Sequence, residues 1–166
     1  MRLILTAGAI FLFAALAQAN TLSPSDAQKL HSLRAKLYSA NVEITQAMDQ
    51  ASGQNPALVT CLGFIHDQAQ SVAETAAAID SLAALAVLMQ DSKDETLLLR
   101  QLKLFLSAMT GAIPNHREII NRAMAQCSTF AIVTVKGQAM LNIFSELNEQ
   151  VASMAQIVAR TIPSRQ

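Results

Sequence analysis

Apolar residues recur at alternating spacings of three and four along this chain, and this pattern constrains the fold more than any other feature of the sequence. The stripes cover residues 30–51, 58–86, 99–127 and 140–158. Spacings of three and four keep side chains on one face of an α-helix, whereas a half-buried strand requires strict alternation. Each stripe therefore predicts a long helix with one face turned to a core.

Residues that favour helix starts stand in front of the first three stripes. Ser23 followed by Pro24 combines an N-cap with a residue suited to the first helical position, and Asn55 followed by Pro56 repeats the device. Asp91 is expected to cap the third helix, since two further acidic residues follow where the helix dipole favours negative charge.

The third helix contains conflicting signals around Pro114. A strict seven-residue spacing from Leu99 to Cys127 suits one continuous helix that is kinked at this proline. Gly111 is a natural terminator, however, and Asn115 opens a segment that resembles a fresh cap. We expect a break near Pro114, with the kinked continuous helix as the alternative.

The run from Thr129 to Val135 is rich in β-branched residues and by itself resembles a strand. A lone strand would have no partner, and helical spacing resumes directly after it. We therefore expect a last helix from Thr129 to Arg160, with a strand over 129–135 as the alternative.

Four long helices joined by short connections predict an all-α, up-and-down antiparallel bundle. Connections of a few residues force neighbouring helices to run antiparallel, and the spacing suits lengthwise packing of one helix on another. No composition shift or low-complexity linker divides the chain. Residues 20–166 should therefore form one domain.

The first nineteen residues have the form of a secretory signal peptide. Arg2 precedes an apolar run from Leu3 to Ala17, and small residues at Ala17 and Ala19 suit cleavage before Asn20. We expect a soluble mature protein in the periplasm or outside the cell, because no later uninterrupted apolar run reaches the ~20 residues of a membrane span. An uncleaved N-terminal anchor is the alternative.

Cys61 and Cys127 are the two cysteines of the chain. Folding the second and third helices back on each other brings both to the end of the hairpin opposite its turn. In an exported protein such a pair is expected to form a disulfide. A redox or metal-binding thiol pair is the alternative, but the Cys-x-x-Cys spacing typical of those sites is absent.

Signatures of catalysis and of cofactor binding are missing. The Glu-x-x-His motif of bundle metal sites fails at His31, His66 and His116, so we predict no metal site. Phosphate-binding glycine loops and nucleophile elbows do not occur either, so no cofactor and no catalytic residue is predicted. Lys and Arg are scattered singly at a formal net charge of +0, which argues against nucleic-acid binding.

An excess of apolar residues flanks the turn at Asp91, within residues 82–106. A bundle helix buries about one stripe, so this apolar pole needs a further cover. The first and last helices could wrap it completely; otherwise it is a binding surface. The residues predicted to form that surface, or to line a ligand cavity, are Leu85, Leu88, Met89, Leu98, Leu104, Phe105 and Met109.

These observations favour binding over catalysis. The first hypothesis is a protein-interaction module that self-associates through the apolar pole. The second is a carrier of a small apolar ligand held between splayed helices. The third is an enzyme whose residues form no recognisable motif.

Overall fold

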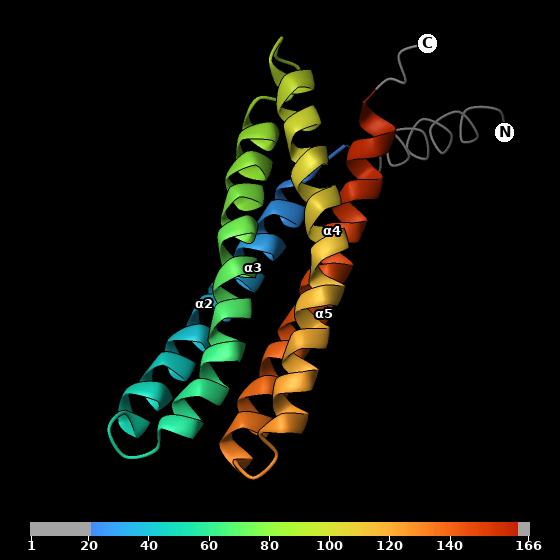
Figure 1. Ribbon diagram of the computed structural model, residues 1–166. Helices are drawn as coiled ribbons and strands as arrows, with labels where there is room; N and C mark the ends of the chain where they lie inside the picture. The colour runs from blue at the N-terminus through green and yellow to red at the C-terminus, as the bar shows by residue number, and fades with distance from the viewer. Residues whose placement is uncertain (1–20, 163–166) are drawn as a thin grey trace, which may run out of the picture.

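The computed structural model describes residues 21–162, and these fold into an up-and-down bundle of four long helices (Figure 1). The helices are α2 (Pro24–Ala51), α3 (Pro56–Leu88), α4 (Glu95–Gln126) and α5 (Ala131–Thr161). Each helix packs against the next, and α2 packs against α5 to close the bundle. The predicted all-α bundle is confirmed. The predicted signal peptide, residues 1–19, lies outside the described residues.

The first two helices begin where their cap residues indicate. Ser23 Oγ accepts a hydrogen bond from the Asp26 amide at 3.2 Å, and Asp26 Oδ2 accepts one from the Ser23 amide at 3.0 Å. This reciprocal pair is a capping box. Asn55 Oδ1 accepts a hydrogen bond from the Leu58 amide at 3.1 Å, so α3 also begins at a side-chain N-cap, without the reciprocal bond.

Helix α4 begins later than predicted. Asp91 does not cap it, because this residue lies in the turn with a left-handed φ of 64°. A short polar side chain tolerates that conformation. The Asp91 amide donates to Glu95 Oε2 at 2.9 Å, and the helix proper starts at Glu95. The turn between α3 and α4 is therefore about one helical turn longer than the sequence indicated.

The predicted break near Pro114 is wrong, because α4 runs through this residue without interruption. A proline inside a helix removes one backbone hydrogen bond and costs about 3 kcal/mol. Leu106, Ile113 and Ile120 on both sides of it are at most 1% exposed. Burying three such side chains stabilises the fold by roughly 1.5–3 kcal/mol each, which outweighs the proline. The seven-residue spacing was the stronger of the two signals.

The β-branched run at the start of the last helix is helical. α5 begins at Ala131 after Phe130, and no strand occurs within residues 21–162. Val133 is fully buried on the same face as Met140 and Phe144. Packing against the core thus overrides the local preference of β-branched residues for strands.

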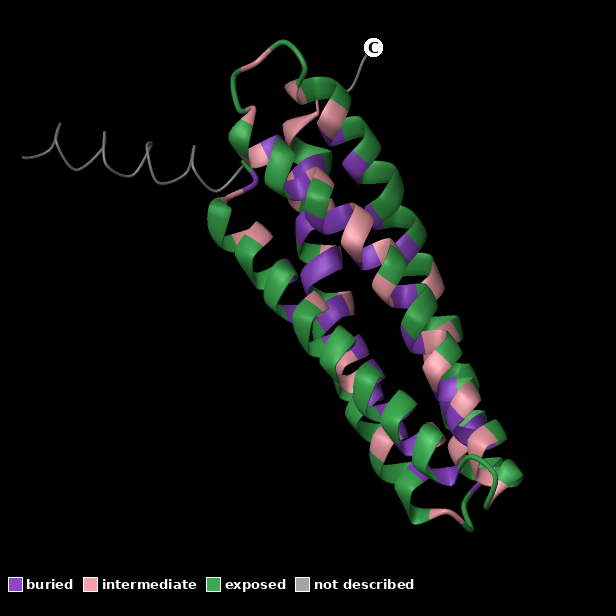
Figure 2. Cartoon of the chain, turned by 90° about the vertical axis from the view of Figure 1, so that its left-hand side faces the viewer, coloured by how far each residue is buried: buried purple, intermediate pink, exposed green. Residues whose placement is uncertain are grey.

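The core is one continuous cluster of buried residues between the four helices. Figure 2 shows buried segments on the inner sides of the helices and exposed segments on their outer sides. The core matches the predicted stripes with one notable difference. Asn41 lies on the core-facing side of α2 at 6% exposure, whereas its neighbour Ala40 is only half-buried. The sequence pattern missed Asn41 because an amide is not counted as apolar.

A disulfide joins Cys61 of α3 to Cys127 at the C-terminal cap of α4, with their Cα atoms 6.0 Å apart. The predicted pairing is confirmed. It lies at the end of the α3–α4 hairpin opposite the turn at Asp91, and it indicates that the protein folds in an oxidising compartment.

By length and composition alone, α3 is apolar enough to cross a membrane. No membrane span was predicted here, because Asp67, Glu74 and Asp80 interrupt the apolar sequence of α3. The helix packs against α2, α4 and α5.

Candidate interaction face

The residues predicted to form the apolar pole fall into three environments. Four side chains are exposed, namely Leu85 (45%), Leu88 (80%), Leu104 (71%) and Phe105 (41%). Met89 and Leu98 are half-buried. Met109 is only 1% exposed because it lies on the side of α4 that faces the bundle core. The prediction that it belongs to an exposed surface is therefore wrong.

Exposed apolar side chains are not confined to the pole. Phe64 and Ile119 are exposed near the disulfide end of the same hairpin, away from the pole, and Leu97 is a further exposed residue within the pole. Seven of the eleven exposed large apolar side chains among the described residues belong to α3 and α4. We call this set the α3–α4 face; it consists of Phe64, Leu85, Leu88, Leu97, Leu104, Phe105 and Ile119.

Three small hollows lie on the α3–α4 face. One hollow of about 160 Å³ lies beside Phe64 and Ile119, and another of about 210 Å³ lies over Leu104 and Phe105. A third, of about 90 Å³, lies over Ala108 with Met109 among its lining residues. Pockets for small molecules usually hold ~300–1,000 Å³. Surfaces of this shape suit protruding side chains of another protein.

Two of the acidic residues of α3 interact away from α4. Asp80, with a side chain only 11% exposed, forms an ion pair with Arg34, whose Nε lies 3.3 Å from Asp80 Oδ2, and the same oxygen lies 3.0 Å from His31 Nδ1. Glu74 accepts from Gln70, which in turn contacts Asn41 of α2. No ion pair between α3 and α4 occurs in the described part of the chain.

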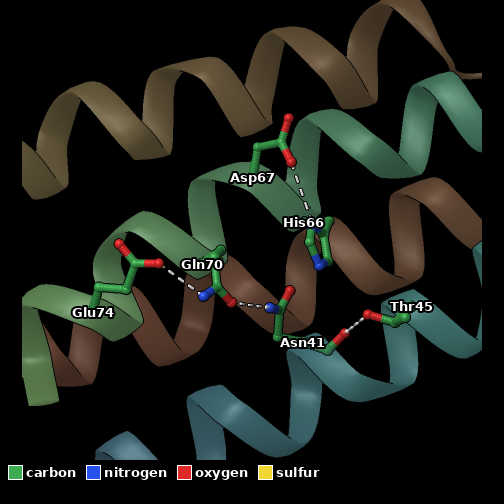
Figure 3. A network of polar contacts seen from close by, with 6 residues as sticks. All are labelled: Asn41, Thr45, His66, Asp67, Gln70 and Glu74. Atoms are coloured by element: carbon green, nitrogen blue, oxygen red, sulfur yellow. Dashed lines mark hydrogen bonds and ion pairs between the residues drawn. The ribbon is translucent and has the colours of Figure 1, made fainter.

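A polar network fixes α2 against α3, opposite to the side where α3 meets α4 (Figure 3). Asn41 Nδ2 donates to Gln70 Oε1 at 3.2 Å, and Gln70 Nε2 donates to Glu74 Oε1 at 2.9 Å. The Asn41 Oδ1 atom is buried without a hydrogen-bond partner. Asn41 is buried and Gln70 is exposed, so this hydrogen bond anchors the polar Asn41 side chain of α2 to α3 at the edge of the core. The apolar spacing of the sequence does not reveal this network.

His116 provides the side-chain hydrogen bond between α3 and α4. Its Nδ1 lies 2.7 Å from Gln68 Oε1, the geometry of an imidazole N–H donating to an amide oxygen. The ring also packs edge-on against Phe144 of α5, with centroids 6.5 Å apart. Burial lowers the pKa of His116 below its usual value of 6.5. His116 of α4 thus contacts both α3 and α5.

Outside the α3–α4 face, the described residues offer few other candidates for a functional site. No three metal-ligating side chains gather anywhere in residues 21–162. A hollow of about 230 Å³ between α2 and α3 is lined by Asp80 and His31, but Asp80 is already occupied by Arg34. The α3–α4 face is thus the best candidate for a functional site. Comparisons of the chain with protein-family models, with curated proteins and with solved structures found no match.

Proposed function

We propose that this protein is an exported, disulfide-stabilised binding module that self-associates through the α3–α4 face. A single observation carries the proposal: exposed large apolar side chains are concentrated on one helix pair. A monomeric protein rarely exposes a contiguous apolar patch larger than a few hundred Å² unless the patch has a use. Single exposed leucines need no explanation, but a set along one hairpin does.

The export part of the proposal is supported by two independent features. The first nineteen residues have the form of a signal peptide, with cleavage expected before Asn20. The disulfide between Cys61 and Cys127 is typical of proteins that fold in an oxidising compartment. The periplasm and the extracellular space are both oxidising.

Binding a protein surface is favoured over carrying a small apolar ligand. The hollows described above are open, and each is smaller than the ~300 Å³ at which small-molecule pockets usually begin. Met109, which was expected to line a ligand cavity, instead packs in the core.

The test is substitution of the most outward leucine of α4. Leu104→Glu should leave the helical content and the free energy of unfolding nearly unchanged, because the side chain is 71% exposed. It should weaken self-association at least ~100-fold in sedimentation velocity, as expected when a carboxylate enters an apolar contact. Val135→Glu is the matched control, because Val135 is 65% exposed on α5 and lies outside the α3–α4 face.

Two results would contradict this proposal. One is equal association of wild type, Leu104→Glu and Val135→Glu. The other is a wild-type protein that remains monomeric at every concentration.

A further inference from the structure

We propose that the α3–α4 face packs against a second copy of this chain through α4, with the two α4 helices antiparallel and the two-fold axis between Ala108 and Gly111. This inference rests on the proposed function, since it specifies the arrangement of the partner on the same face.

Helix α4 carries a second stripe opposite to the one that packs into the core. Its members follow at spacings of seven, four, three and four, and all of them are exposed: Leu97, Leu104, Ala108, Gly111 and Asn115. Spacings of three and four place residues along one line of a helix and suit lengthwise packing against another helix. The outside of α4 therefore has the pattern of a helix–helix contact.

The middle of this stripe lets a partner backbone come close. A Cβ atom built on Gly111 meets nothing within 4 Å, so nothing in the described part of the chain requires a glycine there. Glycine inside a helix is unfavourable relative to alanine. Ala108 lies one turn before it, and together they leave the helix surface bare between Leu104 and Asn115.

Two exposed charged residues of α4 indicate the same position for the two-fold axis, and they indicate that the two α4 helices run antiparallel. Arg100 and Glu118 lie on the same flank of α4, on the side away from α3. The position midway between them in the sequence is residue 109, which falls between Ala108 and Gly111. In an antiparallel pair related by a two-fold axis, equivalent flanks meet, so Arg100 of each copy faces Glu118 of the other. The contact is self-complementary.

A parallel pair would have no such complementarity. Arg122 lies on the outward line of α4 and would face Arg122 of the second copy, which is unfavourable. Within one chain, Arg122 binds Oε1 of Glu118, which leaves Oε2 for a donor from a second copy.

Charge reversal on the mature, oxidised protein tests this register. Arg100→Glu or Glu118→Arg alone should raise the dimer dissociation constant roughly tenfold, because each replaces two attractive contacts with two repulsive ones. The double variant should return to within about twofold of wild type, since the pairs re-form with opposite sign. Lys36→Glu is the matched control, because Lys36 lies at the α2–α5 side and should not change association.

Crosslinking provides a second readout. Ala108→Cys should form a disulfide-linked dimer on mild oxidation, and Val135→Cys should not, because only position 108 lies near the proposed axis. Additive losses in the double charge variant, or crosslinking at 135 and not at 108, would overturn the antiparallel register. The proposed function would survive that result if Leu104→Glu still dissociates the protein. A wild-type protein that is monomeric at all concentrations would overturn both.

Discussion

The two outer sides of this bundle are built differently although the same fold underlies both. Ion pairs tie α2 to α5, with Lys36 Nζ 3.0 Å from Glu146 Oε2 and Lys136 Nζ 2.6 Å from Glu43 Oε2. The α3–α4 side has a disulfide, a hydrogen bond between His116 and Gln68, and exposed leucines.

This difference separates what holds the bundle together from what remains available for binding. Exposed ion pairs contribute only ~0.2–1 kcal/mol each, so the α2–α5 pairs mainly keep that side hydrated. The covalent bond stabilises the α3–α4 hairpin without using its outer surface. Apolar side chains there can therefore serve a contact with another molecule, which is the basis of our proposal.

The largest expected effect concerns the disulfide. Cys61→Ala combined with Cys127→Ala should lower the free energy of unfolding by about 4 kcal/mol, because the bond closes a long loop in the unfolded chain; the two cysteines are 66 residues apart. Urea denaturation of the variant and of the wild type measures this difference. A loss below about 1 kcal/mol would show that the α3–α4 side does not depend on its covalent tie.

Two helical glycines should respond to alanine with opposite signs. A Cβ at Gly137 of α5 would lie 2.5 Å from Met124 Sδ, so Gly137→Ala should destabilise the fold by ~1–3 kcal/mol through overpacking. Gly111→Ala meets open space and should stabilise the isolated chain by up to ~1 kcal/mol. Thermal unfolding at low protein concentration compares the two. Equal losses at both positions would mean that Gly111 is already covered within the monomer.

A third prediction concerns how the free energy of unfolding depends on pH through His116, which connects α4 to α3. Burial lowers the pKa of His116 in the folded state, so the unfolded chain binds the proton more tightly. This histidine therefore favours folding least at acidic pH, and its contribution recovers as the pH rises through the lowered pKa to the unfolded value near 6.5. In His116→Gln the free energy of unfolding should depend less on pH between about 5 and 7. An unchanged slope in urea melts would contradict this.

Much of the fold was predictable because it depends on periodicity and on cap chemistry. Ser23 and Asn55 begin their helices as their side chains indicate, and the stripe residues pack as their spacing requires. The predicted break at Pro114 failed because a local helix breaker was weighed above the long-range spacing from Leu99 to Cys127. Local rules do not include the free energy gained by packing.

The candidate site was predictable only in part. The sequence identified an apolar excess near the turn, and Leu88 and Leu104 are indeed exposed. It did not identify Phe64 and Ile119, since each is a single apolar residue whose exposure depends on the direction of its helix face. It also missed Asn41 and Asp80, because buried polar groups depend on partners from another helix.

Side-chain footprinting with hydroxyl radicals tests most directly whether the α3–α4 face is the surface that becomes covered. Phe105 on that face and Tyr38 on α2, at 68% exposure, are aromatic probes on two different sides of the bundle. As the concentration of wild-type protein rises, oxidation of Phe105 should fall severalfold relative to its own dilute value, while oxidation of Tyr38 stays constant. Constant oxidation of Phe105 at every concentration, or protection of Tyr38 instead, would contradict the account.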